Sequence, residues 1–394
     1  MPVTDCSRRC PPPGERYPPI CASAGANALD SDLLLGGSSR RQGHDNTPPV
    51  PQFCRLFLIR ADAGMPTPGL DTPNPVIIRE GRLSLTRLGM PGILGRVPDA
   101  AAEFSSSAAL PILREACQQA GLSSDGAELL RIGENANFRL ASAPLVVRIS
   151  RSADRLPRVK RELCVARWLA AAEVPAVRMA EEIEQPLMVD GHPVSFWHAV
   201  TGGEPTPTHI DLARLLAAYH AAPDCPCDLV TFEPLTTSGS RLAKAEGVDQ
   251  ADLDFLQARC ADLTNEYEHL EFALPRGPIH GDAHTKNLLT DHGQVVLLDV
   301  EAAAIGPREW DLMPTSIAVQ RYGLPENQYQ EFAATYGFDV RSWPGYPVLR
   351  EIRELTMTTW IMQNVGESPA IAAEFALRVA SLREGDRERA WHFF

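Results

Sequence analysis

The spacing of hydrophobic residues between about 104 and 200 predicts a small, mostly antiparallel sheet. Short apolar or alternating runs bounded by glycine, proline or polar turns are typical of strands. We expect strands at 128–132, 138–140, 145–149, 176–179, 186–189 and 194–200, with a hairpin turn at Asp190-Gly191. Apolar residues at helical spacing predict a helix that starts after the serines at 105–107 and runs through 110–122. A second long helix, at 156–172, is inserted between strands.

After Thr201 the spacing becomes that of amphipathic helices. We expect helices at 210–220, 252–270, 326–336, 349–364 and 371–382. One strand-like interruption, at 288–298, predicts a hairpin whose turn contains Gly293, and it follows a polar loop rich in histidine and aspartate. Active sites commonly lie on such loops and strand ends of a rigid scaffold, so this stretch is the first candidate.

The segment of residues 1–103 differs from the rest of the chain. Its first 100 residues hold 15 of the 34 prolines and no lysine, and no hydrophobic period is sustained. Burial would not offset the entropy cost of ordering such a segment. We therefore expect a disordered tail. A bolder hypothesis is untranslated upstream sequence, with the true start near Met65 or Met90.

Charge and cysteine content limit the possible partners. The net charge of −13 argues against nucleic acid, because phosphate backbones are bound by basic surfaces, whereas it would suit a cationic small molecule. No apolar run reaches the roughly 18 residues of a membrane span, so we expect a cytoplasmic protein with no membrane partner. Nine scattered cysteines predict no disulfide framework. The pair Cys225 and Cys227 would join a metal site only with a second Cys or His pair nearby.

The stretch IHGDAHTKNLLTDHGQVVLLDVE, which begins at Ile279, carries the strongest chemical signal. Asp282 follows a histidine and a glycine, Asn287 lies five residues later, and Asp299 twelve residues after that at a strand end. Phosphoryl transfer needs a base for a hydroxyl group and oxygen ligands for Mg²⁺, and this spacing is that of a kinase-like catalytic loop. The spacing makes Asp282 the candidate base, with Asn287 and Asp299 as candidate metal ligands.

Three further elements precede this loop in the order that kinases use. A strand–loop–strand with Gly133 and Asn137 is a candidate cover for nucleotide phosphates. Arg148 ends an apolar strand, and Glu162 lies on the helix that follows. A charge at the end of a buried strand is costly unless it is paired, which favours an ion pair between Arg148 and Glu162.

The segments HGDAHTKN, LLDVE and GPREWDL resemble the aminoglycoside phosphotransferase family of the protein-kinase-like superfamily, which includes choline and fructosamine kinases. The resemblance covers roughly residues 105 to 394. It implies a bilobal α+β fold, ATP and Mg²⁺ as cofactors, and a small-molecule hydroxyl group as acceptor. It also implies supporting roles for His280 and Glu301, and a structural role for Asp311. The expected division is a tail at 1–103, a nucleotide-binding lobe at 104–200 and a helical catalytic lobe at 201–394.

Two other interpretations of the loop remain. His280, Asp282 and His284 form a literal metal-ligand run, as in a metal-dependent phosphatase or hydrolase, although the required further ligands do not fall in a matching pattern. A kinase-like protein that binds nucleotide without turnover is the second alternative. The acceptor is also open, because Glu351, Glu354 and Glu367 would suit either the ammonium groups of an aminoglycoside or the solvent-exposed faces of helices.

Overall fold

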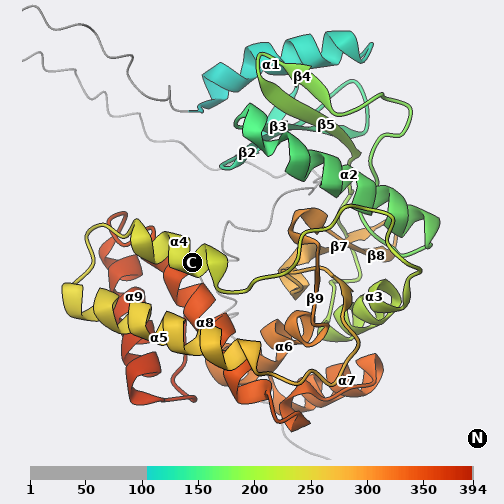
Figure 1. Ribbon diagram of the computed structural model, residues 1–394. Coiled ribbons are helices and arrows are strands. Elements are labelled where there is room, and N and C mark those ends of the chain that lie inside the picture. The colour runs from blue at the N-terminus through green and yellow to red at the C-terminus, as the bar shows by residue number, and fades with distance from the viewer. Residues whose placement is uncertain (1–103, 393–394) are drawn as a thin grey trace, which may run out of the picture. The chain divides into compact units, whose positions relative to one another are not determined.

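The computed structural model describes residues 104–392 (Figure 1). The expected tail at 1–103 and its alternative start sites lie outside this part of the chain. Within it the fold combines an antiparallel sheet with a larger helical part, which confirms the predicted α+β class. None of the helices between residues 104 and 392 is both long and apolar enough to cross a membrane.

The sheet has five strands in the order β1-β2-β3-β5-β4, and every neighbouring pair is antiparallel. Its strands are β1 (Glu128–Ile132), β2 (Asn135–Arg139), β3 (Leu145–Ser150), β4 (Leu187–Val189) and β5 (His192–His198). The β4–β5 turn is Asp190-Gly191, as predicted, and both residues have positive φ. The prediction of a strand at 176–179 is wrong, because Ala176 and Met179 form only isolated bridges.

Strand β3 is buried on both faces, and alternation along it decides where Arg148 points. Leu145, Val147 and Ile149 pack into the core that includes helix α1 (Ser106–Gln119). Val146 packs on the opposite face, against helix α2 (Leu156–Ala171). Since alternate residues of a strand share a face, Arg148 lies on the α2 side of the sheet, where Glu162 is located.

The loop expected at 133–137 is shorter in the structure. Only Gly133 and Glu134 lie between β1 and β2, and Asn135 already pairs with Ser150. Asn137, expected in a loop that covers the nucleotide, is a buried residue of β2 opposite Arg148. Pairing with β3 satisfies the backbone of these asparagines, which outweighs their low strand propensity.

The helical part holds α3 to α9 and two small pairs of strands. The helices are α3 (His209–Ala221), α4 (Thr236–Ala243), α5 (Gln250–Glu268), α6 (Glu309–Tyr322), α7 (Glu326–Tyr336), α8 (Tyr346–Met362) and α9 (Pro369–Glu384). Pattern reading found five of these and missed α4 and α6. Helix α4 begins without a side-chain cap, and α6 contains Pro314 and several buried charged residues, which hide the apolar period.

The two small strand pairs frame the candidate loop. Strand β6 (Gly277–Ile279) pairs with β9 (Ala304–Gly306), and β7 (Leu288–Asp291) pairs with β8 (Gln294–Leu297) in the predicted hairpin. The loop that contains Asp282 therefore leaves β6 and enters the hairpin through a short 3₁₀ turn, Thr285–Asn287.

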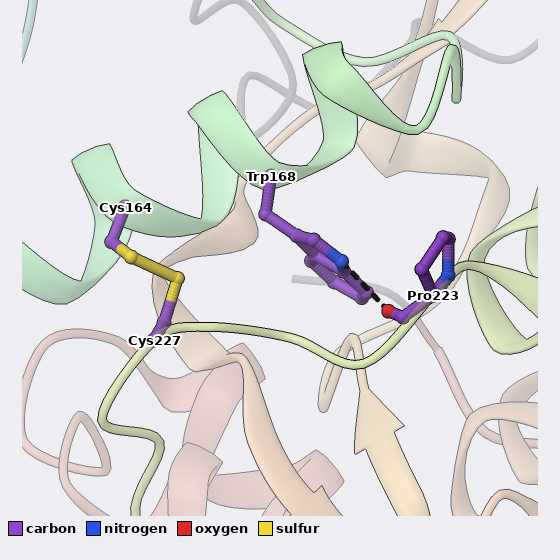
Figure 2. Close-up of a disulfide and its surroundings, with 4 residues drawn as sticks. All are labelled: Cys164, Trp168, Pro223 and Cys227. Carbon is purple, nitrogen blue, oxygen red and sulfur yellow. Dashed lines mark hydrogen bonds between the residues drawn. A yellow bond between two sulfur atoms is a disulfide. The ribbon is translucent and has the colours of Figure 1, made fainter.

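Helix α2 is fastened to the segment that follows α3 by two links (Figure 2). A disulfide joins Cys164 to Cys227, and Nε1 of Trp168 donates a hydrogen bond to the carbonyl of Pro223 at 2.9 Å. The cysteine count predicted no disulfide framework, and it did not predict this bridge. The conditional metal site at Cys225 and Cys227 does not fit, because Cys227 is covalently paired.

Candidate active site

The backbone of the candidate catalytic loop is held by Asp311 at the start of α6. One carboxylate oxygen of Asp311 accepts a hydrogen bond from the amide of His280 at 2.6 Å, and the other accepts from the amide of Gly281 at 2.8 Å. Nε1 of Trp310 donates to the carbonyl of Gly281, also at 2.8 Å. Asp311 is fully buried and also meets the ring of His220, so this clamp is part of the core.

Glycine is required at position 281 on two grounds. Its φ of +85° lies in the left-handed region, which residues with a side chain rarely adopt. A Cβ atom there would lie 2.4 Å from the carbonyl oxygen of Ala302. The loop that carries Asp282 thus packs directly against the turn that follows Asp299.

His280 supports the loop with both ring nitrogens. Nε2 is 2.8 Å from the carbonyl of Leu298, and Nδ1 accepts a hydrogen bond from the amide of Asp282 at 3.3 Å. Its side chain is fully buried. With both nitrogens engaged it does not fit a metal-ligand role, and no group of three His, Cys, Asp or Glu residues between 104 and 392 is arranged to hold a metal ion.

Asp282, the candidate base, is partly exposed and meets the side chains of Arg353 and His284. Its Oδ1 accepts a hydrogen bond from Nη2 of Arg353 at 2.7 Å, and its Oδ2 lies 3.4 Å from Nε2 of His284. Burial would raise the pKa of Asp282, but His284 and Arg353 outweigh it and hold that pKa well below its usual range. The carboxylate is therefore charged at neutral pH.

Asn287 and Asp299, the candidate metal ligands, are both held close to this loop. Nδ2 of Asn287 donates to the carbonyl of Asp282 at 2.9 Å, and this contact fixes the amide group. Asp299 has a φ of +56°, a strained backbone of the kind that collects at functional sites. Burial and the nearby Glu301 raise its pKa.

The donor set suits a magnesium ion. The Oδ1 atom of Asp299 is buried without a hydrogen-bond partner among the described residues, which is costly unless a ligand satisfies it. Mg²⁺ prefers carboxylate and amide oxygens supplemented by phosphate and water. Asp299 and Asn287 supply one oxygen ligand of each type.

Arg148 joins the sheet to the turn after Asp299. Its Nη1 is 2.5 Å from Oε1 of Glu162, as the sequence predicts, and its Nη2 is 2.6 Å from Oε2 of Glu301. Arg158 binds the second oxygen of Glu301 at 2.9 Å. These four residues form the Arg148 network. Burial would lower the pKa of Arg148, but the two glutamates raise it, so the guanidinium stays charged.

The two residues expected to cover the nucleotide make none of these ion pairs, although Asn137 lies opposite Arg148 in the sheet. The carbonyl of Gly133 accepts a hydrogen bond from Arg151 at 3.0 Å, and a Cβ at Gly133 would meet nothing within 4 Å. Glycine at this position is therefore not required by packing. Asn137 presents a buried Oδ1 that has no partner among the described residues.

Sequence reasoning missed Arg353 and misjudged the glutamates on its helix. Glu354, expected at an acceptor site or on a solvent-exposed face, is buried and bonded to Arg321 and Arg350. The Arg350–Glu354 spacing of four residues on a predicted helix was the available signal. Glu351 is bound by Arg259.

A candidate catalytic loop clamped onto α6, together with an arginine on a strand that is held by a glutamate on a helix, is the arrangement expected of a phosphotransferase with the protein-kinase-like fold. Sequence comparison agrees, because residues 128–352, more than half of the chain, match the model of the phosphotransferase enzyme family. The chain belongs to this family. The resemblance seen in the sequence is thereby confirmed, and membership supports a small-molecule phosphotransferase.

Solved structures share this fold at low sequence identity. The chain is similar to a microcompartment-associated aminopropanol kinase, with a TM-score of 0.53 and 20% identity over 71% of this chain and 99% of that one. It is also similar to the choline kinase LicA from Streptococcus pneumoniae, with a TM-score of 0.52 and 13% identity over 70% and 99%. The amicoumacin kinase hAmiN gives 0.52 and 13% over 68% and 90%. No curated protein matches the sequence.

Proposed function

We propose that the chain transfers the γ-phosphoryl group of ATP to a hydroxyl group of a small molecule, with Mg²⁺ as cofactor. The observation that carries this proposal is the buried Oδ1 of Asp299, which has no hydrogen-bond partner within residues 104–392 and lies beside a loop with a charged Asp282. A structural relative in complex with AMP-PNP and Ca²⁺, the amicoumacin kinase, supports the use of a nucleotide and a divalent metal.

In the proposed reaction Asp282 positions the acceptor hydroxyl group and takes its proton. The acceptor oxygen forms a bond to the γ-phosphorus, and the bond from that phosphorus to the β–γ bridging oxygen breaks. The electron pair of the broken bond remains on ADP. Positioning and charge stabilisation account for most of the rate in this class of reaction.

Asp299 and Asn287 would hold the magnesium ion, which when bound neutralises charge on the phosphate oxygens. In this proposal Arg148, oriented by Glu162 and Glu301, contacts the phosphates of the nucleotide, while Gly133 and Asn137 cover it. Residues 104–200 then form the nucleotide-binding lobe and 201–394 the helical catalytic lobe.

The test is an isosteric change at the base. Asp282→Asn should lower ADP release by about 100- to 10,000-fold, the usual contribution of a positioned base, while calorimetry still detects binding of Mg²⁺–ATP. Release would be measured with pools of amino alcohols, sugars, hydroxy acids and aminoglycosides. Asp262→Asn, an exposed change on α5, is the matched control and should retain activity.

Two outcomes would contradict the proposal. Near-normal ADP release in Asp282→Asn would remove Asp282 from the role of base. Binding of Mg²⁺–ATP without Asp282-dependent ADP release from any pool would favour the non-catalytic alternative.

A further inference from the structure

Arg353 on α8 is a buried cation with unused hydrogen-bonding capacity beside the candidate base. It is only 9% exposed, and its guanidinium lies over the ring of Trp310 at 5.1 Å. With the residues between 104 and 392 it makes a single hydrogen bond, from Nη2 to Asp282. Its Nε is buried and has no hydrogen-bond partner among the described residues. An arginine has five N–H donors, so most of those of Arg353 are not used by the described residues.

A second arginine extends from the helix that packs against this part of α8. Arg241 on α4 is half-buried, and its Nη1 reaches the carbonyl of Thr356 at 3.5 Å. Thr356 is three residues beyond Arg353, so α4 packs against the stretch of α8 from which Arg353 extends. Burial lowers the pKa of Arg241 and the charge of Glu134 opposes this shift, but no carboxylate between 104 and 392 forms an ion pair with Arg241. We call Arg241 and Arg353 the arginine pair.

Three carboxylates on α8 and α9 are already paired with other arginines. The ion pairs are Glu351 with Arg259, Glu354 with Arg321 and Arg350, and Glu374 with Arg378. An acceptor that carries several ammonium groups would need carboxylates that are free to bind it. These three carboxylates are bound elsewhere, so they do not favour a polyamine as the acceptor.

The composition of the whole chain makes the pairing of these two arginines more informative. With 50 acidic and 37 basic residues, acidic side chains are plentiful, yet Arg353 forms one ion pair, with the partly exposed Asp282, and Arg241 forms none with the described residues. Desolvating an arginine without an acidic partner costs free energy, which a bound anion would recover. Arginine donors also match the planar oxygens of a carboxylate or a phosphate.

We propose that the acceptor carries an anionic group, a carboxylate or a phosphate, beside the hydroxyl group that is phosphorylated, and that Arg353 and Arg241 bind this group. The inference rests on the proposed function, because it assigns the substrate class of the same site. In this proposal the acceptor hydroxyl group lies at Asp282. The anionic group of the acceptor accepts hydrogen bonds from the N–H groups of Arg353 that do not bind Asp282.

The test compares acceptors that differ in charge. ADP release by the full chain would be measured with serine, glycerate and 4-hydroxybutyrate, with glycerol 3-phosphate, and with ethanolamine, glycerol and 4-aminobutanol. Turnover is expected in the carboxylate or the phosphate arm, and the arm that responds identifies the anion. Arg353→Gln and Arg241→Gln should each raise the KM of that acceptor by about 10- to 100-fold, the usual value of a hydrogen bond to a charged group, with a smaller change in kcat.

Matched variants separate recognition from folding. Arg383→Gln removes an exposed arginine that is paired with Asp252 on α5 and should leave the KM unchanged. Arg353→Lys should recover part of the affinity, because it restores the charge. Arg241 is half-exposed, so its variant reports on recognition even if Arg353→Gln folds poorly.

Turnover confined to neutral or cationic acceptors would overturn the inference. The absence of turnover with any anionic acceptor would do the same, as would anionic acceptors whose KM is unchanged in both arginine variants. Failure of the proposed function has a different signature, since Mg²⁺–ATP would then fail to bind, or ADP release with every acceptor would be independent of Asp282.

Discussion

The Arg148 network and the arginine pair differ in their balance of charge. In the network two arginines, Arg148 and Arg158, bind the carboxylates of Glu162 and Glu301, so each of these charges has an opposite partner. In the arginine pair Arg353 binds only Asp282, which is partly exposed, and Arg241 forms no ion pair with the described residues, although the charge of Glu134 acts on it. A balanced network can hold a geometry without a ligand, whereas an unbalanced group of buried charges is stabilised when a ligand completes it. The two regions thus favour different roles, positioning in the first and binding in the second.

Among the changes that compare these two regions, the largest effect is expected at Asp299, which borders the balanced network. Asp299→Asn removes the carboxylate that we assign to Mg²⁺, so turnover should fall by about 100-fold or more, and binding of Mg²⁺–ATP should weaken. Steady-state ADP release and calorimetry at several magnesium concentrations would measure both. Asp190→Asn, an exposed change at the β4–β5 turn, is the control. Unchanged magnesium dependence in Asp299→Asn would remove this residue from the metal site.

A middle-sized effect is expected at the disulfide, because α2 carries both Glu162 and Cys164. Cys227→Ser should lower the free energy of unfolding by about 2–4 kcal/mol and weaken nucleotide binding, while the KM of the acceptor stays constant. Urea unfolding with and without a reductant would measure the first effect. Cys225→Ser, which leaves the bridge intact, is the matched control. Equal stability of the two variants would show that the bridge does not stabilise the fold.

The smallest effect is expected in the pH dependence. A lowered pKa keeps the Asp282 carboxylate charged as the pH falls, so the acid limb of kcat/KM should lie well below neutral pH. Arg353→Gln removes one source of that lowering, so the variant should lose activity at a pH about one unit higher. Profiles for the wild type and Arg383→Gln should coincide. If the pH profile of kcat/KM for Arg353→Gln coincides with that of the wild type, Arg353 does not influence the ionisation of Asp282.

Part of this structure could be predicted because it depends on residues that are close to one another in the sequence. The Arg148–Glu162 pair follows from strand alternation and a helix that comes next in the sequence, and Asp282, Asn287 and Asp299 follow from their spacing. Contacts between residues that are far apart in the sequence could not be predicted from one sequence. Arg353 meets Asp282 across 71 residues and Cys164 meets Cys227 across 63, and no local period marks either contact.

Where the pattern misled, competing interactions explain it. Asn137 has a low strand propensity, but pairing with Arg148 across β2 and β3 overrides it. Helix α6 buries Glu309, Asp311 and Arg321, so the positions of its buried face are polar in the sequence. A hydrophobic period cannot reveal a helix whose buried residues are held by hydrogen bonds and ion pairs.

The contact between Gly281 and Ala302 has a consequence for how the protein can evolve. Because the backbone of the Asp282 loop touches the backbone of the turn after Asp299, the spacing of these two carboxylates is set by main-chain atoms. Arg241 and Arg353, in contrast, are side chains on two separate helices, each of which can be replaced by one mutation. With the proposed role of these two arginines, mutations can change which acceptor binds without altering the site that we assign to ATP and Mg²⁺. Among descendants of this sequence, we therefore expect the acceptor to change more often than the mechanism.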